Sequence, residues 1–365
     1  MSDLIELTRA LVAVESINPD LGSGGSGEAG VARVAADWAQ RAGLDVELEE
    51  AAPGRPNVIV TARGTGGGRS LMLNAHMDTV GVEGMADPFS GRLEGARLYG
   101  RGAYDMKGSL AACLLTAAAV HRLRVRGDVV VTAVADEEYG SVGTEAIARR
   151  RTADAAIVTE PTEERLVLAH KGFVGFEIDV AGRAAHGSRP DLGVDAIARS
   201  GPVLTRIGDL AERLQAGPGH PLLGTGSVHA SLISGGQEYS SYPASCRIVA
   251  ERRTVPGETR DVVSAEIREL LGDVDGSWRP TLAREPFEIG TDTEIAALVA
   301  RHAGEPAVAG APYWADSALL HDAGIPTVLY GPRGEGLHAE VEWVDVESLE
   351  RCLGVYVAVA AELCA

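Results

Sequence analysis

The sequence predicts an α/β protein that is divided by a smaller inserted α+β domain. Residues 1–173 alternate helical patterns with short apolar runs, which is typical of a sheet covered by helices. Residues 174–284 follow a strand–helix–strand–strand–helix–strand order. The α/β pattern of the first part then resumes over residues 285–365. We therefore predict one α/β domain from residues 1–173 and 285–365, with an α+β sandwich inserted at residues 174–284.

The first part of the α/β domain begins with two amphipathic helices. One apolar face is formed by Leu4, Leu7, Leu11 and Val14, and the next by Val31, Val34, Ala35 and Trp38. Short apolar runs bounded by Gly, Pro or charged residues then predict buried strands at residues 57–61, 71–74, 129–134 and 155–159. The Ala- and Leu-rich stretch 107–123 predicts a buried helix between them.

The inserted segment has the alternation of a sheet with one covered face. Phe176, Ile178 and Val180 alternate with acidic residues, which predicts a half-exposed strand. Further elements follow as a helix at about 194–214, strands at 227–233 and 246–252, and a helix at 259–271. After about residue 284 the α/β pattern continues to a last helix at 346–363.

Composition excludes several classes of function. The 365 residues carry 33 basic and 52 acidic side chains, a net charge of −19. Such a chain lacks the clustered Lys and Arg that nucleic acid requires, and an anionic membrane surface would repel it. No apolar run reaches the roughly 18 residues of a membrane-spanning helix. We predict a small-molecule substrate rather than a nucleic acid or a membrane.

The N-terminus and the cysteines predict a cytoplasmic protein. Asp3, Glu6 and Arg9 within the first 14 residues fit neither a signal peptide nor a transit peptide. The four cysteines are far apart and form no CxxC pair, so we expect reduced thiols.

Acidic and imidazole side chains follow several predicted strands, where the functional groups of open α/β sheets gather. His76 and Asp78 follow one strand in the segment LMLNAHMDTV, and a carboxylate two residues from a histidine can orient its ring. Asp105 lies between glycines in GRGAYDMKG, just before a helix. Taken singly, these residues also fit a hydrogen-bonded loop and a helix cap.

Three further clusters complete this set. Glu137 and Glu138 are adjacent in ADEEYGSVG, so their side chains diverge, and one can bind a metal while the other holds water. A solvated acidic turn would have the same sequence. Glu160 closes another strand in VTEPT, and His338 follows the strand 326–330 in GLHAEVE.

Together these clusters supply the ligands of a two-metal site. Mixed imidazole and carboxylate ligands with a shared aspartate suit a pair of Zn²⁺ ions. One aspartate has to bridge, because two cations roughly 3.5–4 Å apart repel unless an anion lies between them. A spare glutamate would then act as general base on a bridging water.

The order of these motifs closely resembles the zinc-dependent aminoacylase/exopeptidase family of acetylornithine deacetylase, succinyl-diaminopimelate desuccinylase, aminoacylase-1 and carboxypeptidase G. The resemblance runs from His76 to Glu342 and includes the inserted domain. It implies a mixed central sheet flanked by helices, as in di-zinc exopeptidases, and an inserted domain that acts as a lid and forms a homodimer. It also implies two Zn²⁺ ions, with Co²⁺ or Mn²⁺ as substitutes.

The resemblance also implies a role for each motif residue. Asp105 would bridge both metals, and its peptide bond to Met106 would be cis, although Met106 itself departs from the Asp that often follows. Glu137 would be the general base, and Asp78 would brace His76. The remaining ligands fall into two sets, His76 with Glu160 at one metal and Glu138 with His338 at the other.

The inserted domain would contribute to substrate binding. By resemblance, His186 in AHGSRP would donate to the oxyanion, in dimeric members at the partner subunit's site. Arg253 in RRTVP would bind the α-carboxylate of the substrate, with Arg252 as the competing candidate. Ser240 stands where family members commonly carry a substrate-contacting Asn and is therefore a candidate substrate-binding residue. Asp316 in YWADSALL is a candidate neighbour of the metal ligands.

We predict a metal-dependent hydrolase that cleaves the amide bond of an N-acyl amino acid. A dipeptidase or carboxypeptidase of the same family is the main alternative, because its metal ligands would be identical. A binding protein that keeps the fold and a two-metal phosphoesterase are the alternatives from other classes. The intact base and ligand set disfavours the first, and the placement of Arg253 and His186 disfavours the second, by analogy.

Overall fold

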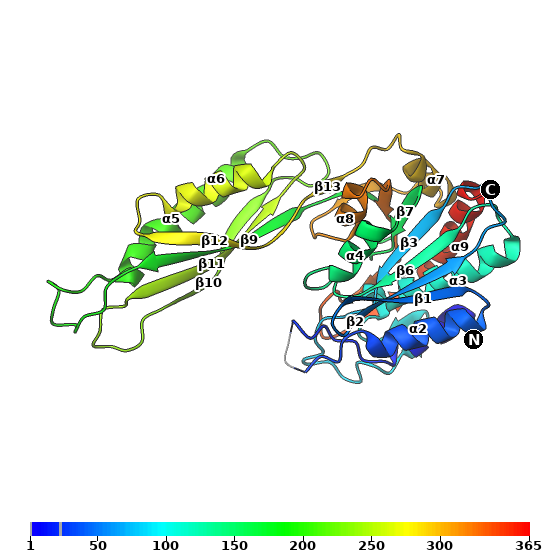
Figure 1. The fold of residues 1–365 in the computed structure, drawn as a ribbon, viewed down its shortest axis with the longest axis horizontal. Helices are drawn as coiled ribbons and strands as arrows, with labels where there is room; N and C mark the ends of the chain where they lie inside the picture. The colour runs from blue at the N-terminus through cyan, green and yellow to red at the C-terminus, as the bar shows by residue number, and fades with distance from the viewer. Residues whose placement is uncertain (1, 22–23) are drawn as a thin grey trace. The chain divides into compact units, whose positions relative to one another are not determined.

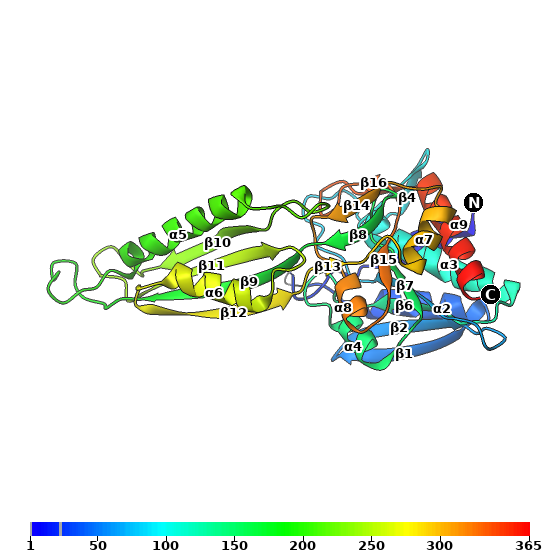
Figure 2. The ribbon, with the colours of Figure 1, turned by 90° about the horizontal axis from the view of Figure 1, so that it is seen from above.

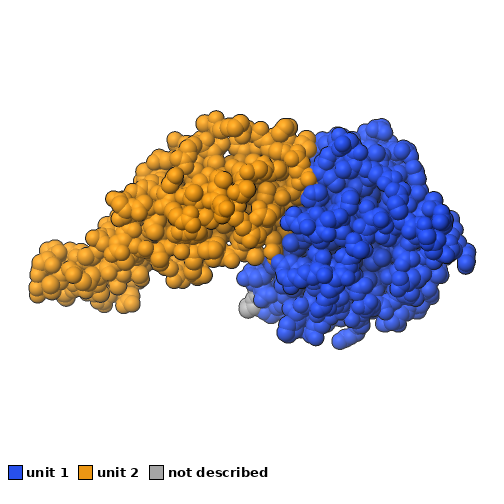
Figure 3. Space-filling model, turned by 45° about the horizontal axis from the view of Figure 1, so that its top comes forward, with its two compact units in different colours: residues 1–168, 289–309, 315–365 blue, residues 169–288, 310–314 orange. Residues whose placement is uncertain are grey.

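The computed structural model describes residues 2–21 and 24–365, which divide into two compact units. Unit 1 comprises residues 1–168, 289–309 and 315–365, apart from the undescribed positions. Unit 2 comprises residues 169–288 and 310–314 (Figure 3). Each unit has its own sheet and its own buried core, so each is described separately.

The main mixed sheet lies mostly in unit 1 and has the strand order β1-β2-β6-β3-β7-β15-β8-β13, with β14 paired to β8 (Figures 1 and 2). Of its strands, β13 and the last two residues of β8 and of β14 belong to unit 2. The strands are β1 (Asp45–Ala52), β2 (Arg55–Ala62), β3 (Leu71–His76), β6 (Val129–Val134), β7 (Ala155–Val158), β8 (Leu166–His170), β13 (Phe287–Glu288), β14 (Val308–Ala311) and β15 (Thr327–Leu329). β3 is parallel to both β6 and β7, whereas β1, β2 and β6 pair antiparallel. The predicted fold class is confirmed.

Helices flank this sheet on its two sides. They are α1 (Asp3–Val12), α2 (Ala29–Arg41), α3 (Gly108–Leu123), α4 (Val142–Arg150), α7 (Glu294–His302), α8 (Ser317–Asp322) and α9 (Val346–Leu363). Figure 1 shows α3 and α9 on one side and α4 with α8 on the other. α3 is apolar on nearly every face and is almost wholly buried, as its Ala- and Leu-rich sequence predicts.

Some elements of unit 1 are not in the predicted set. A second small sheet has the order β16-β17-β5-β4, from Gly334–Glu335, Trp343–Asp345, Arg97–Tyr99 and Arg92–Glu94. Strands of two or three residues are too short to show a periodicity. β1 was not predicted because its sequence, DVELEEAA, is rich in acidic residues. It is an edge strand of the main sheet and is largely accessible to solvent, so it can carry charged side chains.

Unit 2 is a two-layer sandwich of one antiparallel sheet and two helices. The sheet order is β10-β11-β9-β12, from Ser227–Gly235, Ser245–Thr254, Gly172–Ala181 and Gly276–Arg284. α5 (Ala196–Ala216) and α6 (Arg260–Leu271) lie along the same face of it (Figure 1). Burial alternates along β9, with Phe176, Ile178 and Val180 in the core, as the alternation in the sequence predicts.

Two further observations concern the whole described chain. All four cysteines are free and buried. Within residues 2–21 and 24–365, none of the helices combines the length and apolarity needed to cross a lipid bilayer.

Candidate metal centre

The candidate site lies beyond the carboxyl ends of three neighbouring strands of unit 1. β3 ends at His76, the loop after β6 carries Glu137 and Glu138, and Glu160 follows β7. Because β3 pairs in parallel with both β6 and β7, these strand ends meet at one edge of the sheet. Local sequence thus positions each ligand, and strand pairing brings the ligands together.

Five of the predicted residues form two ligand groups that share Asp105. In the first group, His76 Nε2 lies 3.0 Å from Asp105 Oδ1 and 3.9 Å from Glu160 Oε1. In the second group, His338 Nε2 lies 3.5 Å from Asp105 Oδ2 and 3.1 Å from Glu138 Oε2. The ligand atoms of each group all lie within 4.8 Å of one another. Asp105 therefore presents one carboxylate oxygen to each group.

Asp78 orders two parts of this site. His76 Nδ1 lies 2.9 Å from the main-chain oxygen of Asp78, which turns Nε2 toward Asp105. The Asp78 carboxylate lies 3.6 Å from the same ring nitrogen, and it accepts the N–H groups of Glu137 and Glu138, each at 3.1 Å. Asp78 thus orients the ring mainly through its backbone and the acidic loop through its side chain.

The segment that carries Asp105 has an unusual backbone. Over Ala103–Lys107 the chain is kinked, with non-helical values at Asp105 (φ −116°, ψ 92°) and Met106 (φ −137°, ψ 34°), and the Asp105–Met106 peptide is cis, as expected from the resemblance. Glu342 Oε1 accepts the N–H groups of Tyr104 at 2.9 Å and Asp105 at 3.0 Å, and Glu342 Oε2 pairs with Arg101 at 2.6 Å. Sequence reasoning assigned no role to Glu342, because nothing local distinguishes it from its neighbour Glu340.

The ligand groups concentrate negative charge where water is scarce. Burial raises the pKa of Glu160 well above its usual value, and the charge of Asp105 adds to this rise. Burial and the charge of Glu160 likewise raise the pKa of Glu137. Burial alone would raise the pKa of Asp105, but hydrogen bonds from His338 and His76 outweigh it and lower that pKa. The site therefore calls for additional positive charge.

The residues present fit divalent metal ions. Glu160 Oε1 is buried and has no hydrogen-bond partner among the described residues, so it is available as a ligand atom. Imidazole nitrogen and carboxylate oxygen are both ligands that Zn²⁺ accepts. Hydrogen bonds to Asp105 and Glu138 raise the pKa of His338 to about 10, which shows that these carboxylates attract a cation.

Asp316 lies in the helix-capping position before α8 and outside both ligand groups. Its Oδ2 accepts the hydroxyl of Thr144 at 2.6 Å, and burial raises its pKa to about 6. Its Oδ1 is buried and has no hydrogen-bond partner in the described part of the chain.

The predicted substrate-binding residues lie in unit 2. His186 is exposed in a loop, with Nδ1 2.8 Å from the hydroxyl of Ser188. Arg253 lies in β11, donates to Glu251 at 2.6 Å and places its guanidinium 5.2 Å from the ring centroid of Phe173. Its neighbour Arg252 is buried and paired, so only Arg253 of these two presents a partly exposed guanidinium.

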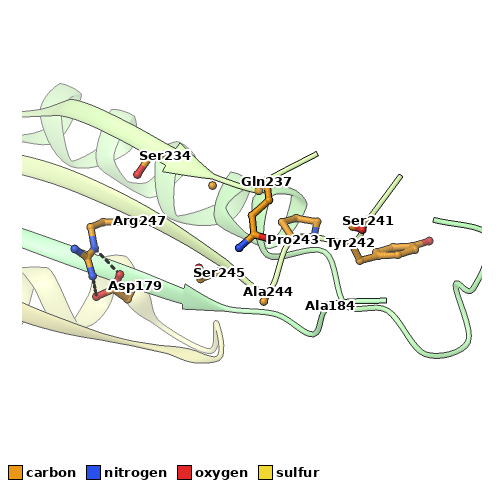
Figure 4. A pocket seen from close by; sticks show the side chains of 12 residues that line it. Asp179, Ala184, Ser234, Gln237, Ser241, Tyr242, Pro243, Ala244, Ser245 and Arg247 are labelled. Carbon is orange, nitrogen blue, oxygen red and sulfur yellow. Dashed lines mark hydrogen bonds and ion pairs between the residues drawn. The ribbon is translucent and has the colours of Figure 1, made fainter. Parts of the chain in front are cut away.

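A cavity of about 410 Å³ lies beside the segment that carries Ser240 (Figure 4). Ser240 is exposed, and its hydroxyl lies 3.4 Å from Glu238 Oε1. The next residue, Ser241, lines the cavity together with Gln237. Figure 4 shows Arg247 turned toward Asp179, which also lines the cavity, and the two side chains form a 2.7 Å ion pair.

The chain matches the model of "Peptidase family M20/M25/M40" over residues 72–362. It is 31% identical to acetylornithine deacetylase of Myxococcus xanthus, over 87% of this chain and 86% of that protein. It is 30% identical to acetylornithine deacetylase of Proteus mirabilis, over 95% and 93%. It is 27% identical to N-formyl-4-amino-5-aminomethyl-2-methylpyrimidine deformylase of Bacillus subtilis, over 95% and 91%.

Solved structures share the fold. An M20 family metallo-carboxypeptidase from Sulfolobus solfataricus superimposes with a TM-score of 0.82 at 18% identity, covering 100% of this chain and 99% of the other. A dinuclear metal binding peptidase of the M20 family from Bacillus subtilis superimposes with a TM-score of 0.73 at 16% identity, covering 99% and 97%.

Proposed function

This chain belongs to peptidase family M20/M25/M40, and from that premise we propose that it is a di-zinc enzyme that deacylates an N-acyl amino acid. It is a metal-dependent hydrolase that acts on amides. The observation that carries the proposal is the sharing of Asp105 between two ligand groups, with Glu137 in the adjoining loop. A shared carboxylate is the arrangement that two adjacent cations require.

Each ligand has a place in this proposal. His76 and Glu160 would hold one ion, Glu138 and His338 would hold the other, and Asp105 would serve both. Bound Zn²⁺ would polarise the substrate carbonyl and lower the pKa of a bound water, and Co²⁺ or Mn²⁺ could replace it.

Glu137 performs the proton transfers. It takes the proton of the attacking water at its carboxylate and returns it to the nitrogen of the departing amine. Its burial and its raised pKa suit a carboxylate that must both accept and release a proton. Asp78 supports this role, because its carboxylate holds the backbone of Glu137.

Residues 174–284 act as a lid that binds the substrate. His186 donates to the oxyanion of the tetrahedral intermediate, and Arg253 binds the α-carboxylate. The partly exposed guanidinium of Arg253, with one carboxylate partner, supports this assignment over Arg252. Ser240 belongs to the substrate-binding residues of this lid.

The same domain forms a homodimer. β10 is an edge strand of the unit 2 sheet, and Leu232 and Ile233 on it are 67% and 51% exposed. Long apolar edge strands invite pairing with another chain. The protein acts in the cytoplasm, in keeping with four free cysteines.

The substrate class follows the relatives that align along most of the chain. Two of these are acetylornithine deacetylases, and a third is a deformylase that also removes an acyl group from nitrogen. The shared fold with a metallo-carboxypeptidase makes peptide substrates the second candidate.

The test is amine release from a panel of N-acetyl, N-succinyl and N-formyl amino acids, dipeptides and a γ-glutamyl conjugate. Release from an acyl amino acid, lost with a chelator and restored by Zn²⁺ or Co²⁺, is the expected result. Release from dipeptides alone would replace deacylation with peptide cleavage. Release that persists after verified metal removal would overturn the proposal.

A further inference from the structure

The acidic loop after β6 turns on Asp136, the residue just before Glu137. Asp136 has φ +69°, the left-handed region that few residues other than glycine adopt. Its carbonyl accepts the N–H of Gly140 at 3.1 Å, which closes the loop. This conformation decides in which directions Glu137 and Glu138 leave the backbone.

A buried arginine holds Asp136 in this conformation. Arg55, at the start of β2, has a side chain only 9% exposed, and its Nη2 donates to Asp136 Oδ1 at 2.9 Å. Its Nε and Nη2 also donate to the two carboxylate oxygens of Glu28 at 2.8 and 2.7 Å. Glu28 Oε1 accepts the N–H of Asp136 at 3.2 Å. The Glu28–Arg55 pair therefore holds both the side chain and the backbone of Asp136.

Asn18 connects this pair to the rest of the site. Its Nδ2 donates to Asp136 Oδ1 at 3.0 Å and to Asp78 Oδ2 at 2.7 Å. Asp78 in turn accepts the N–H groups of Glu137 and Glu138. A continuous chain of hydrogen bonds thus runs from Arg55 through Asp136 and Asn18 to the backbone of both glutamates.

We propose that Arg55 is a positioning residue that holds the acidic loop so that Glu138 meets its ligand group and Glu137 stays beside it. The proposal rests on the proposed roles of these two glutamates. Arg55 does not belong to either ligand group and acts through Asp136. Arg55 Nη2 lies 2.7 Å from Glu28 Oε1 and 2.9 Å from Asp136 Oδ1. Without this cation, the two buried carboxylates would lack a counter-charge and would repel each other.

The test is metal titration of the metal-free protein by calorimetry with Arg55→Lys. Lysine keeps the charge but cannot make the forked contacts to Glu28 and Asp136. Because only one ligand group contains Glu138, we expect one of the two binding events to weaken about 10–100-fold, while the other stays unchanged. In the loaded enzyme, kcat should fall by a similar factor with KM within about twofold.

Asp136→Asn completes a double-mutant cycle. Asparagine also tolerates the left-handed conformation, so this change removes the charge and leaves the loop conformation accessible. Since both substitutions break the same contact, the double variant should bind the affected ion no more weakly than Arg55→Lys alone. Losses that multiply would overturn the link through Asp136.

Arg252→Lys is the matched control. Arg252 in unit 2 is even more deeply buried and forms ion pairs with Glu258 and Glu266. It should lower thermal stability and leave both metal-binding events unchanged. Wild-type metal binding in Arg55→Lys, or equal losses in both variants, would overturn the proposal. If the wild-type chain cleaves no amide and Arg55→Lys still weakens one binding event, the positioning role stands and the proposed reaction fails.

Discussion

Each unit of this protein buries an arginine that holds two carboxylates together, Arg55 in unit 1 and Arg252 in unit 2, and these two arginines serve different ends. Arg55 in unit 1 is 9% exposed and holds Glu28 and Asp136. Arg252 in unit 2 is 1% exposed and holds Glu258 and Glu266. The partners of Arg55 hold the loop that carries two candidate site residues. Those of Arg252 belong to α6 and to the turn before it, where Glu258 also accepts the N–H of Val255.

The two buried arginines differ in the structural elements that they hold in place. Removing a partner from a buried ion pair leaves an uncompensated charge, so both clusters make their surroundings rigid. In unit 1 this rigidity falls on irregular backbone beyond the strand ends. In unit 2 it fastens a helix to a sheet whose remaining core is almost entirely aliphatic, with one aromatic anchor at Phe176.

The largest effect should come from Glu137→Gln in unit 1. Glutamine keeps the shape of the side chain and cannot accept the proton of water, so we expect kcat to fall about 10²–10⁴-fold with both metal ions retained. Steady-state kinetics and metal analysis measure the two quantities. Glu145→Gln, in α4 and paired with Arg149 at the surface, is the control and should stay near wild type. Near wild-type turnover in folded Glu137→Gln would remove the assigned base.

The second effect concerns the core of unit 2. Phe176 is fully buried between the sheet and both helices, so Phe176→Ala should lower the free energy of unfolding by about 3–5 kcal/mol. Urea unfolding followed by circular dichroism measures this loss. Metal stoichiometry at unit 1 should not change. Tyr239→Ala, at a fully exposed position, is the control and should be close to neutral. Loss of metal from folded Phe176→Ala would contradict the independence of the two cores.

The same contrast explains which parts of the site were predictable. His76, Glu138 and Glu160 stand at or shortly after strand ends, Asp105 precedes α3, and His338 lies in a loop after β16, so local patterns and their order locate them. Parallel pairing of β3 with β6 and β7 then brings the first three together. Most of the candidate metal ligands could therefore be predicted from the residue types at strand ends.

The supporting residues were not predictable by such reasoning. Arg55 and Asp136 are 81 positions apart, and Glu342 lies 237 positions from the N–H of Asp105 that it accepts. Nothing local distinguishes these side chains from surface charges, because their role depends on tertiary contacts. The small β4–β5–β16–β17 sheet was missed for a related reason, since two- or three-residue strands are defined by their partners.

Lys107, another buried cation, tests whether unit 1 tolerates a charge without a carboxylate contact. Lys107 donates to the main-chain oxygen of Val14 at 2.7 Å, and burial lowers its pKa from 10.5 to about 7. Between these values the unfolded chain binds more protons, so stability should rise with pH by up to about 1.4 kcal/mol per unit. Lys107→Met removes this dependence.

Urea unfolding of the metal-free proteins from pH 6 to 9.5 measures the effect of Lys107→Met. The free energy of unfolding of the variant should exceed that of wild type most at pH 6, where Lys107 is charged in both the folded and the unfolded wild-type chain. This advantage should shrink by about 2 kcal/mol between pH 7.5 and 9.5. A difference that does not vary with pH would mean that Lys107 titrates normally in the fold.

The smallest effect separates the two neighbouring arginines of unit 2. Arg253 is partly exposed, pairs with Glu251 and stacks on Phe173, whereas Arg252 is committed to two carboxylates. If Arg253 binds the substrate carboxylate, Arg253→Met should raise KM about 10–100-fold, the loss of one charge-assisted contact, and change kcat little. Methionine keeps the apolar contact with Phe173, so stability should hardly change. A substrate amide analogue without the carboxylate should bind wild type and Arg253→Met equally. If wild type bound this analogue more tightly than Arg253→Met does, Arg253 would contact another part of the substrate.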